Sequence, residues 1–179
     1  MKTKTPLAPN QKIFIDLEFL EDGHTIELIS IAAVREDGAE YYAVNSEFDW
    51  DNCQDEWLRK HVLPHVENTA SWDKKPKQQI AEEMKKFAGK NPEFWADYAS
   101  YDWIGLCQLY GKMIELPPTW PKFVRDVQQL QDEIRRTKKP KKLSTLRPHN
   151  SPEHHPLYDA RDCKARYDYL NELRYMRYS

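Results

Sequence analysis

Three apolar runs joined by short turn signals lie within the first 45 residues, and they constrain the fold more than any other feature. They occupy residues 12–20, 25–34 and 39–44 and read KIFIDLEFL, TIELISIAAV and AEYYAV. The connecting EDGH and REDG segments pair acidic residues with glycine, a combination typical of hairpin turns. Because strands on short turns pair with their neighbours in antiparallel fashion, we expect a three-stranded meander.

The rest of the chain alternates helix-like and strand-like segments. Helices are predicted over 55–62 (ended by Pro64), 77–88, 102–111 and 157–176, a buried strand over 93–99, and a strand running into a helix over 123–136. Residues 137–153 form a basic, proline-bearing loop. This order predicts the α/β class, with one mixed five-stranded sheet: three antiparallel strands, then parallel strands, flanked by helices.

Length and composition predict a single domain over residues 12–179, preceded by a flexible tail over residues 1–11. No apolar run is long enough to span a membrane, and the opening MKTKTPLAPNQK lacks the apolar segment of a secretory signal. The three cysteines form no CxxC pair, so reduced thiols and a cytoplasmic location are expected. A net charge of -2 neither indicates nor excludes a nucleic-acid partner.

Two acidic residues interrupt the first apolar run. Asp16 and Glu18 are two residues apart, so in a strand both point to one face, whereas Ile13, Ile15, Leu17 and Phe19 point to the other. Burying two like charges costs several kcal/mol per ion, which calls for compensating positive charge. Cations could supply that charge. Alternatively, both acids lie at the strand end, where they reach water or pair with Arg or Lys.

Further candidates lie in the second half of the chain. Asp102 follows the buried strand, and Asp159 stands at the start of the last helix, five residues after His154. Two Mg²⁺ or Mn²⁺ ions about 4 Å apart need carboxylate oxygens from several segments, and a general base beside them suits a histidine that Pro156 keeps off the helix. The alternatives are an N-cap role for Asp102, an exposed acid at Asp159 and a surface histidine.

Three motifs together resemble those of the DEDDh 3′–5′ exonucleases. They are DLEF, YASYDWIGL and HHPLYDA, in that order. The segments FIDLEFLEDGHTIELISIAAV, EYYAV, YDWIGLCQLYG and LPPTWPKF more closely resemble a bacterial branch described as polyadenylate-specific 3′-exoribonuclease. The resemblance covers most of residues 12–175 and implies a ribonuclease H-like fold.

The resemblance also implies roles for individual residues. Asp16 and Glu18 match the metal-binding pair of the first motif, Asp102 the aspartate of the second, Asp159 the last metal ligand, and His154 the general base. It implies removal of nucleoside 5′-monophosphates from the 3′ end of single-stranded RNA with two divalent ions, Mg²⁺ or Mn²⁺, by a homodimer. The alternatives are a DNA 3′–5′ exonuclease of the same mechanism and a catalytically idle relative that binds nucleic acid.

The sequence departs from the family pattern at two positions. Leu17 stands where many members carry threonine, and Pro156 where the family often has a small residue. The last motif also contains a second pattern, Tyr158 with Asp162, which is typical of a sister subclass. We favour His154 with Asp159, because the surrounding residues agree with the closer branch, and expect Asp162 to support the site or lie on the surface.

Substrate contacts are predicted from residues close to the acids. Phe19 is expected to stack on a base, with Leu20 and His24 near it, although Phe19 could equally be a core aromatic. The stretch RRTKKPKK, residues 135–142, could hold RNA phosphates or be a solvated loop. His61 and His65 have the spacing of helical zinc ligands, but Pro64 lies between them and no glutamate follows His61, so we exclude a zinc site there.

Overall fold

The fold is known from a computed structural model, which describes residues 11–147 and 152–176. The strands are β1 Lys12–Glu21, β2 Ile26–Arg35, β3 Glu40–Asn45, β4 Lys74–Lys75, β5 Glu93–Ala96 and β6 Arg125–Asp126. The α-helices are α1 Glu56–His61, α2 Leu63–Glu67, α3 Lys77–Ala88, α4 Ser100–Gln108, α5 Val127–Arg135 and α6 Pro156–Tyr175, with short 3₁₀ helices at Ser71–Asp73, Met113–Glu115 and Leu143–Leu146. Most of the predicted N-terminal tail, residues 1–10, lies outside the described residues, so the domain boundary stays a prediction.

All six strands form one sheet in the order β4-β3-β2-β1-β5-β6. The predicted meander is confirmed, because β1 pairs antiparallel with β2, and β2 antiparallel with β3. On the other side of β1, β5 and β6 continue in parallel. The α/β class is therefore confirmed, but the predicted strand count was one too low. The additional strand, β4, is two lysines that pair with the end of β3, and so short a polar strand leaves no apolar pattern.

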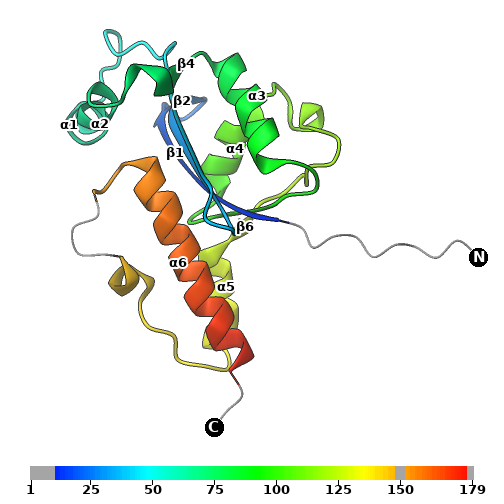
Figure 1. Cartoon of the computed structure of the whole chain (residues 1–179). Coiled ribbons are helices and arrows are strands. Elements are labelled where there is room, and N and C mark those ends of the chain that lie inside the picture. The colour runs from blue at the N-terminus through cyan, green and yellow to red at the C-terminus, as the bar shows by residue number, and fades with distance from the viewer. Residues whose placement is uncertain (1–10, 148–151, 177–179) are drawn as a thin grey trace, which may run out of the picture.

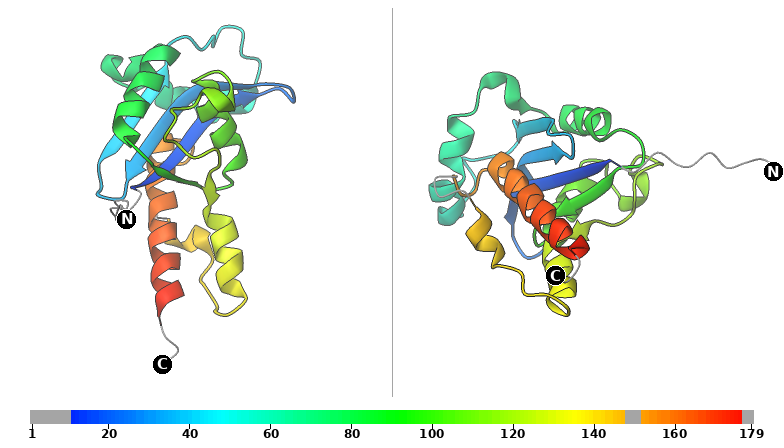
Figure 2. Two further views of the ribbon diagram at one scale, coloured as in Figure 1. Left: turned by 90° about the vertical axis from the view of Figure 1, so that its right-hand side faces the viewer. Right: turned by 60° about the horizontal axis from the view of Figure 1, so that its bottom comes forward.

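Helices cover both faces of the sheet (Figure 1). On one face, Ile13, Ile15 and Leu17 of β1 pack with residues of α3 and α4. On the other face, Phe14 packs with residues of α5 and α6, and the second view shows α6 crossing the sheet (Figure 2). The central strand is thus buried on both faces.

A third apolar cluster fastens α1 and α2 to the sheet. Leu58, Val62 and Val66 from this helical pair pack against Ile29 and Val44. The predicted helix over 55–62 is shorter than expected, and Pro64 does not end it but occupies the first turn of α2. Proline is well tolerated there, because the first helical N–H groups have no partner within the helix. No helix in the described part of the chain is long and apolar enough to cross a membrane.

Candidate active site

The two acids of β1 lie where the central strand changes register. Asp16 is opposite Ala32 and Glu18 opposite Ser30, and the pairing shifts between Glu18 and Phe19. Such an irregularity bends a strand and redirects the side chains beside it. Asp16 and Glu18 share one face of β1, as predicted, and both line a pocket of about 500 Å³.

Asp102 reaches β1 from α4. The helix begins at Ser100, so the prediction that Asp102 opens it was wrong by two residues. Its carboxylate accepts the backbone N–H of Leu17 at 2.9 Å, which satisfies a buried donor between the two strand acids. Gly105 gives α4 room to approach, since a Cβ there would lie 2.7 Å from Cδ2 of Leu17 and that side chain would have to shift.

Asp159 completes the acidic cluster from the first turn of α6. One carboxylate oxygen each from Asp16, Glu18 and Asp159 lie within 4.8 Å of one another. Asp102 lines the same pocket but does not belong to this group of three. The structure therefore brings all four predicted acids to one pocket, with three of them at the spacing of ligands to a shared ion.

Burial and repulsion between neighbouring acids disfavour charge on three of the carboxyls, those of Asp16, Glu18 and Asp102. Burial raises the pKa of Glu18 to about 8, and the charges of Asp159 and Asp102 contribute to this rise. Burial also raises the pKa of Asp102 to about 7, against the opposing effect of the Leu17 N–H, and lifts the pKa of Asp16 well above its usual range. Hard divalent cations prefer clustered carboxylate oxygens and favour their ionised form. The donor set thus fits such ions.

Arg147 lies against Asp159 in the same pocket. Its Nη1 donates to Oδ1 of Asp159 at 2.6 Å and lies 3.2 Å from Oδ2 of Asp162, and its Nη2 donates to the carbonyl of Pro152 at 2.5 Å. Asp162 is buried and lies outside the group of three acids. This placement supports our preference for Asp159 over Asp162 as the site acid.

His154 lies beside the acids on a short connection into α6. His155 is the N-cap of that helix and Pro156 follows it, so His154 stays off the helix as predicted. Its backbone φ of 58° is in the left-handed region, which is uncommon for a residue with a side chain. Partial burial lowers the pKa of His154, and the negative charge of Asp159 opposes this effect. The ring therefore stays neutral at a lower pH than that of an exposed histidine.

Of the three residues predicted to contact substrate, one lines the pocket and two do not. Phe19 lines the pocket and stacks on Tyr101, with ring centroids 5.8 Å apart and planes at 9°. Leu20 packs against the cluster under α1, and His24 is exposed in the turn after β1; neither lines the pocket among the described residues. Their contact with substrate stays a prediction.

Sequence reasoning missed several residues of the pocket. They are Asp97, Tyr98, Tyr101, Arg147 and Glu153. Asp97 follows β5. Its carboxylate accepts a hydrogen bond from Nε2 of Gln128 at 2.7 Å and another from Nη1 of Arg166. Its position just after a strand parallel to β1 was a usable signal, because such strand ends meet at one edge of a sheet. Arg147, in an irregular loop, gave no such signal.

The basic stretch 135–142 lies partly against α6. Lys138 donates to the carbonyl oxygens of Leu173, Arg174 and Met176 at the end of that helix. Positive charge is favourable at a helix C-terminus, so Lys138 has a structural role there. Whether the other lysines contact RNA stays a prediction.

Comparison with known proteins gives consistent matches. The family model described as the 3′–5′ exoribonuclease Rv2179c-like domain matches residues 11–170. Two proteins named 3′–5′ exoribonuclease, Rv2179c and MT2234.1 from two strains of Mycobacterium tuberculosis, are each 42% identical over 160 residues, which cover 87% of this chain and 90% of the relative. The RNase domain of the yeast Pop2 protein superposes with a TM-score of 0.65 at 12% identity, over 90% of this chain and 77% of that one. This structural match confirms the predicted ribonuclease H-like fold.

Proposed function

The chain belongs to the Rv2179c-like 3′–5′ exoribonuclease domain family, and from that premise we propose that it hydrolyses the last phosphodiester at the 3′ end of single-stranded RNA. The products would be nucleoside 5′-monophosphates. One observation carries the proposal: oxygens of Asp16, Glu18 and Asp159 converge within 4.8 Å in a pocket that His154 also lines. RNA as the substrate class rests on the family and on the names of the relatives.

The acids are proposed to hold two divalent ions, Mg²⁺ or Mn²⁺. Asp16, Glu18 and Asp159 would supply the oxygens nearest to each other, and Asp102 would add its carboxylate while fixing the backbone at Leu17. When bound, such ions supply Lewis acidity that activates water and stabilises charge on the leaving 3′ oxygen. Their binding would also offset the burial and the repulsion by neighbouring acids that together raise the pKa of Glu18.

The remaining residues of the pocket would handle the proton and the RNA end. A ring nitrogen of neutral His154 accepts the proton of the attacking water, and the lowered pKa of His154 keeps the ring neutral near pH 7. Phe19 and Tyr101, already stacked on one another, offer an aromatic surface to the terminal base. Stacking of this kind can be made with every base.

Hydrolysis of RNA labelled at its 5′ end tests this proposal. We expect a ladder of products shortened one nucleotide at a time, dependent on Mg²⁺ or Mn²⁺ and absent in Asp16→Asn. Asp51→Asn is a matched control, because Asp51 is exposed and outside the pocket. Internal cuts, or an unchanged ladder in Asp16→Asn, would refute the proposal.

Two further points need their own measurements. The same assay with a DNA oligonucleotide of identical sequence distinguishes a ribonuclease from a DNA exonuclease, and preference for RNA is the expected result. The family resemblance also leads us to propose a homodimer, which analytical ultracentrifugation would detect as twice the 21.4 kDa mass of the chain.

A further inference from the structure

The residues that carry His154 have no regular secondary structure to hold them. Residues 152–155 precede α6 and belong to no helix or strand. His154 itself has a left-handed backbone conformation, which costs free energy and persists only where the surroundings enforce it. The position of the His154 ring therefore depends on side-chain contacts from other elements.

The first of these contacts comes from α1. The ring of Trp57 meets that of His154 edge to face, with centroids 4.6 Å apart. His61, one turn further along α1, has its ring centroid 5.8 Å from that of His154 and 5.0 Å from that of Trp57. Edge-to-face packing is directional, so these two side chains constrain the plane of the His154 ring as well as its location.

The second contact comes from α2 and is made to the backbone. Nε2 of His65 lies 3.0 Å from the carbonyl oxygen of Glu153, to which it donates a hydrogen bond. The His65 ring also packs edge to face on His155, at 5.4 Å. In the sequence, the spacing of His61 and His65 resembled that of a zinc pair. In the structure, the His61 ring lies near His154, and the His65 ring contacts its two neighbours, Glu153 and His155.

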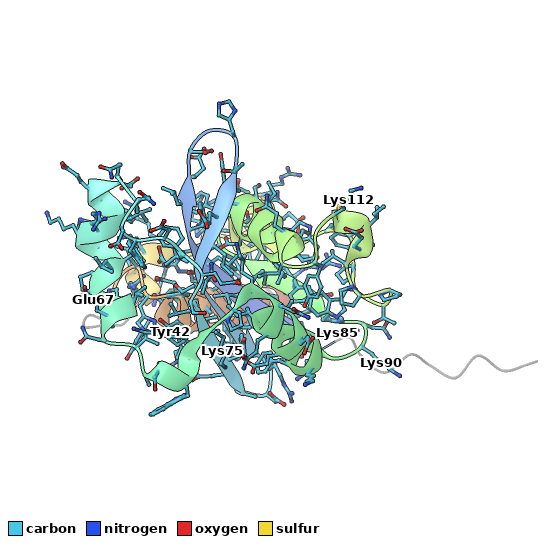
Figure 3. All side chains as sticks on the ribbon, turned by 90° about the horizontal axis from the view of Figure 1, so that it is seen from above. Tyr42, Glu67, Lys75, Lys85, Lys90 and Lys112 are labelled. Atoms are coloured by element: carbon cyan, nitrogen blue, oxygen red, sulfur yellow. The ribbon has the colours of Figure 1, made fainter. Side chains whose placement is uncertain are left out.

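The helical pair is itself firmly attached to the sheet. Leu58, Val62 and Val66 are buried in the apolar cluster beneath it. Just after the C-terminal end of α2, the hydroxyl group of Thr69 lies 3.0 Å from that of Tyr42 on β3. Tyr42 and Glu67, the last residue of α2, lie on the same side of the molecule (Figure 3). The ring of Tyr42 also stacks on His155, at 4.8 Å. The contacts to residues 153–155 are therefore made by two helices that packing against the sheet holds in place.

We propose that Trp57, His61 and His65 are positioning residues that hold the general base His154 at the reaction centre. The inference rests on the proposed function, since it gives these residues a role through His154 and not through the RNA or the ions. It also explains why α1 and α2, which supply none of the acids, lie beside the pocket. Burial of the His154 ring disfavours its charged form; Asp159 and Glu153 favour that form, whereas His61 and Arg147 oppose it.

Kinetics of Trp57→Ala and His65→Ala, each made in wild type and in His154→Ala, test the inference. A misplaced general base costs rate, so we expect kcat to fall about 10- to 100-fold while KM and the Mn²⁺ dissociation constant stay at wild-type values. In the His154→Ala background neither substitution should reduce kcat further, because residues acting through one group are not additive. Trp72→Ala is the control, since Trp72 is exposed and lies outside the pocket.

Conservative variants separate positioning from folding. Trp57→Phe keeps an aromatic ring, and His65→Gln keeps a donor near the place of Nε2, so both should recover most of the lost kcat. Wild-type kcat in both alanine variants, a rise in KM alone, or an equal loss in the His154→Ala background would each overturn the inference. Asp16→Asn is measured alongside to keep the two proposals distinct. Activity in that variant would refute the proposed function itself, whereas its inactivity together with wild-type kcat in the alanine variants would refute only the positioning role.

Discussion

Replacing Glu18 by glutamine should stabilise the metal-free protein. Burial and the neighbouring acids raise the pKa of Glu18 from 4.5 to about 8. At pH 7 the Glu18 carboxyl is ionised in the unfolded chain, because the pH is about 2.5 units above its ordinary pKa, but it is mostly protonated in the folded protein. Each unit corresponds to about 1.4 kcal/mol, so Glu18 lowers the free energy of unfolding at pH 7 by about 3 kcal/mol. Glu18→Gln removes this cost. For a chain of this size the gain raises Tm by about 6–12 °C.

The sign of the pH dependence provides a second check. Below about pH 4.5 Glu18 is protonated in both the folded and the unfolded chain, so the variant and wild type should be equally stable. Their difference should grow as pH rises from 4.5 to 8, the window set by the ordinary and the raised pKa, and stay constant above it.

Urea unfolding at pH 4, 7 and 9 in EDTA, repeated at saturating Mn²⁺, measures these differences. Mn²⁺ at a hundredfold excess over Kd should remove most of the difference at pH 7, because an ion that binds the native state stabilises it by about 2.7 kcal/mol and the variant has lost a ligand. Glu21→Gln, at the exposed end of the same strand, should match wild type throughout. Equal stability of wild type and Glu18→Gln at pH 9 in EDTA would refute the reasoning.

Contacts at the pocket lead to three more predictions. Arg147→Met should weaken Mn²⁺ binding, measured by calorimetry, about 10- to 100-fold, because Arg147 orients Asp159. Arg161→Met, which breaks the ion pair with Glu40, is the control and should not weaken it. Equal Mn²⁺ binding by both variants would contradict this role of Arg147. Phe19→Ala should raise the KM for RNA by the loss of about 1–3 kcal/mol of base stacking at unchanged Mn²⁺ affinity, and an unchanged KM would exclude the stacking role. Gly105→Ala should lower the free energy of unfolding by about 1–3 kcal/mol, because its Cβ meets Leu17, whereas Ile104→Ala at an exposed position should change little; urea unfolding decides between them.

Much of the fold was predictable because its signals are local. The alternation of β1 and the turns after it specified the meander, and Ile80, Met84 and Phe87 at helical spacing specified α3. β4 was missed because its two lysines become a strand only by pairing with β3, a contact between distant segments. Pro64 was interpreted as a helix end, although proline fits the first turn of a helix equally well, and α2 has Pro64 in its first turn.

The candidate site was predictable in its acids and less so in their supports. Asp16 and Glu18 stood out because charges in an apolar strand need an explanation, and Asp102 and Asp159 followed from the family motifs. The pairing of Arg147 with Asp159 depends on how a loop folds back, which no periodicity encodes. His61 and His65 were noticed for their spacing, but their contacts with residues 153–155 follow from tertiary packing.

Anomalous diffraction from a crystal grown with Mn²⁺ tests the account most directly. We predict manganese peaks between the carboxylates of Asp16, Glu18 and Asp159, two of them about 4 Å apart when the RNA end is bound. Absence of manganese among these carboxylates, in crystals of a protein that hydrolyses RNA with Mn²⁺, would contradict the account.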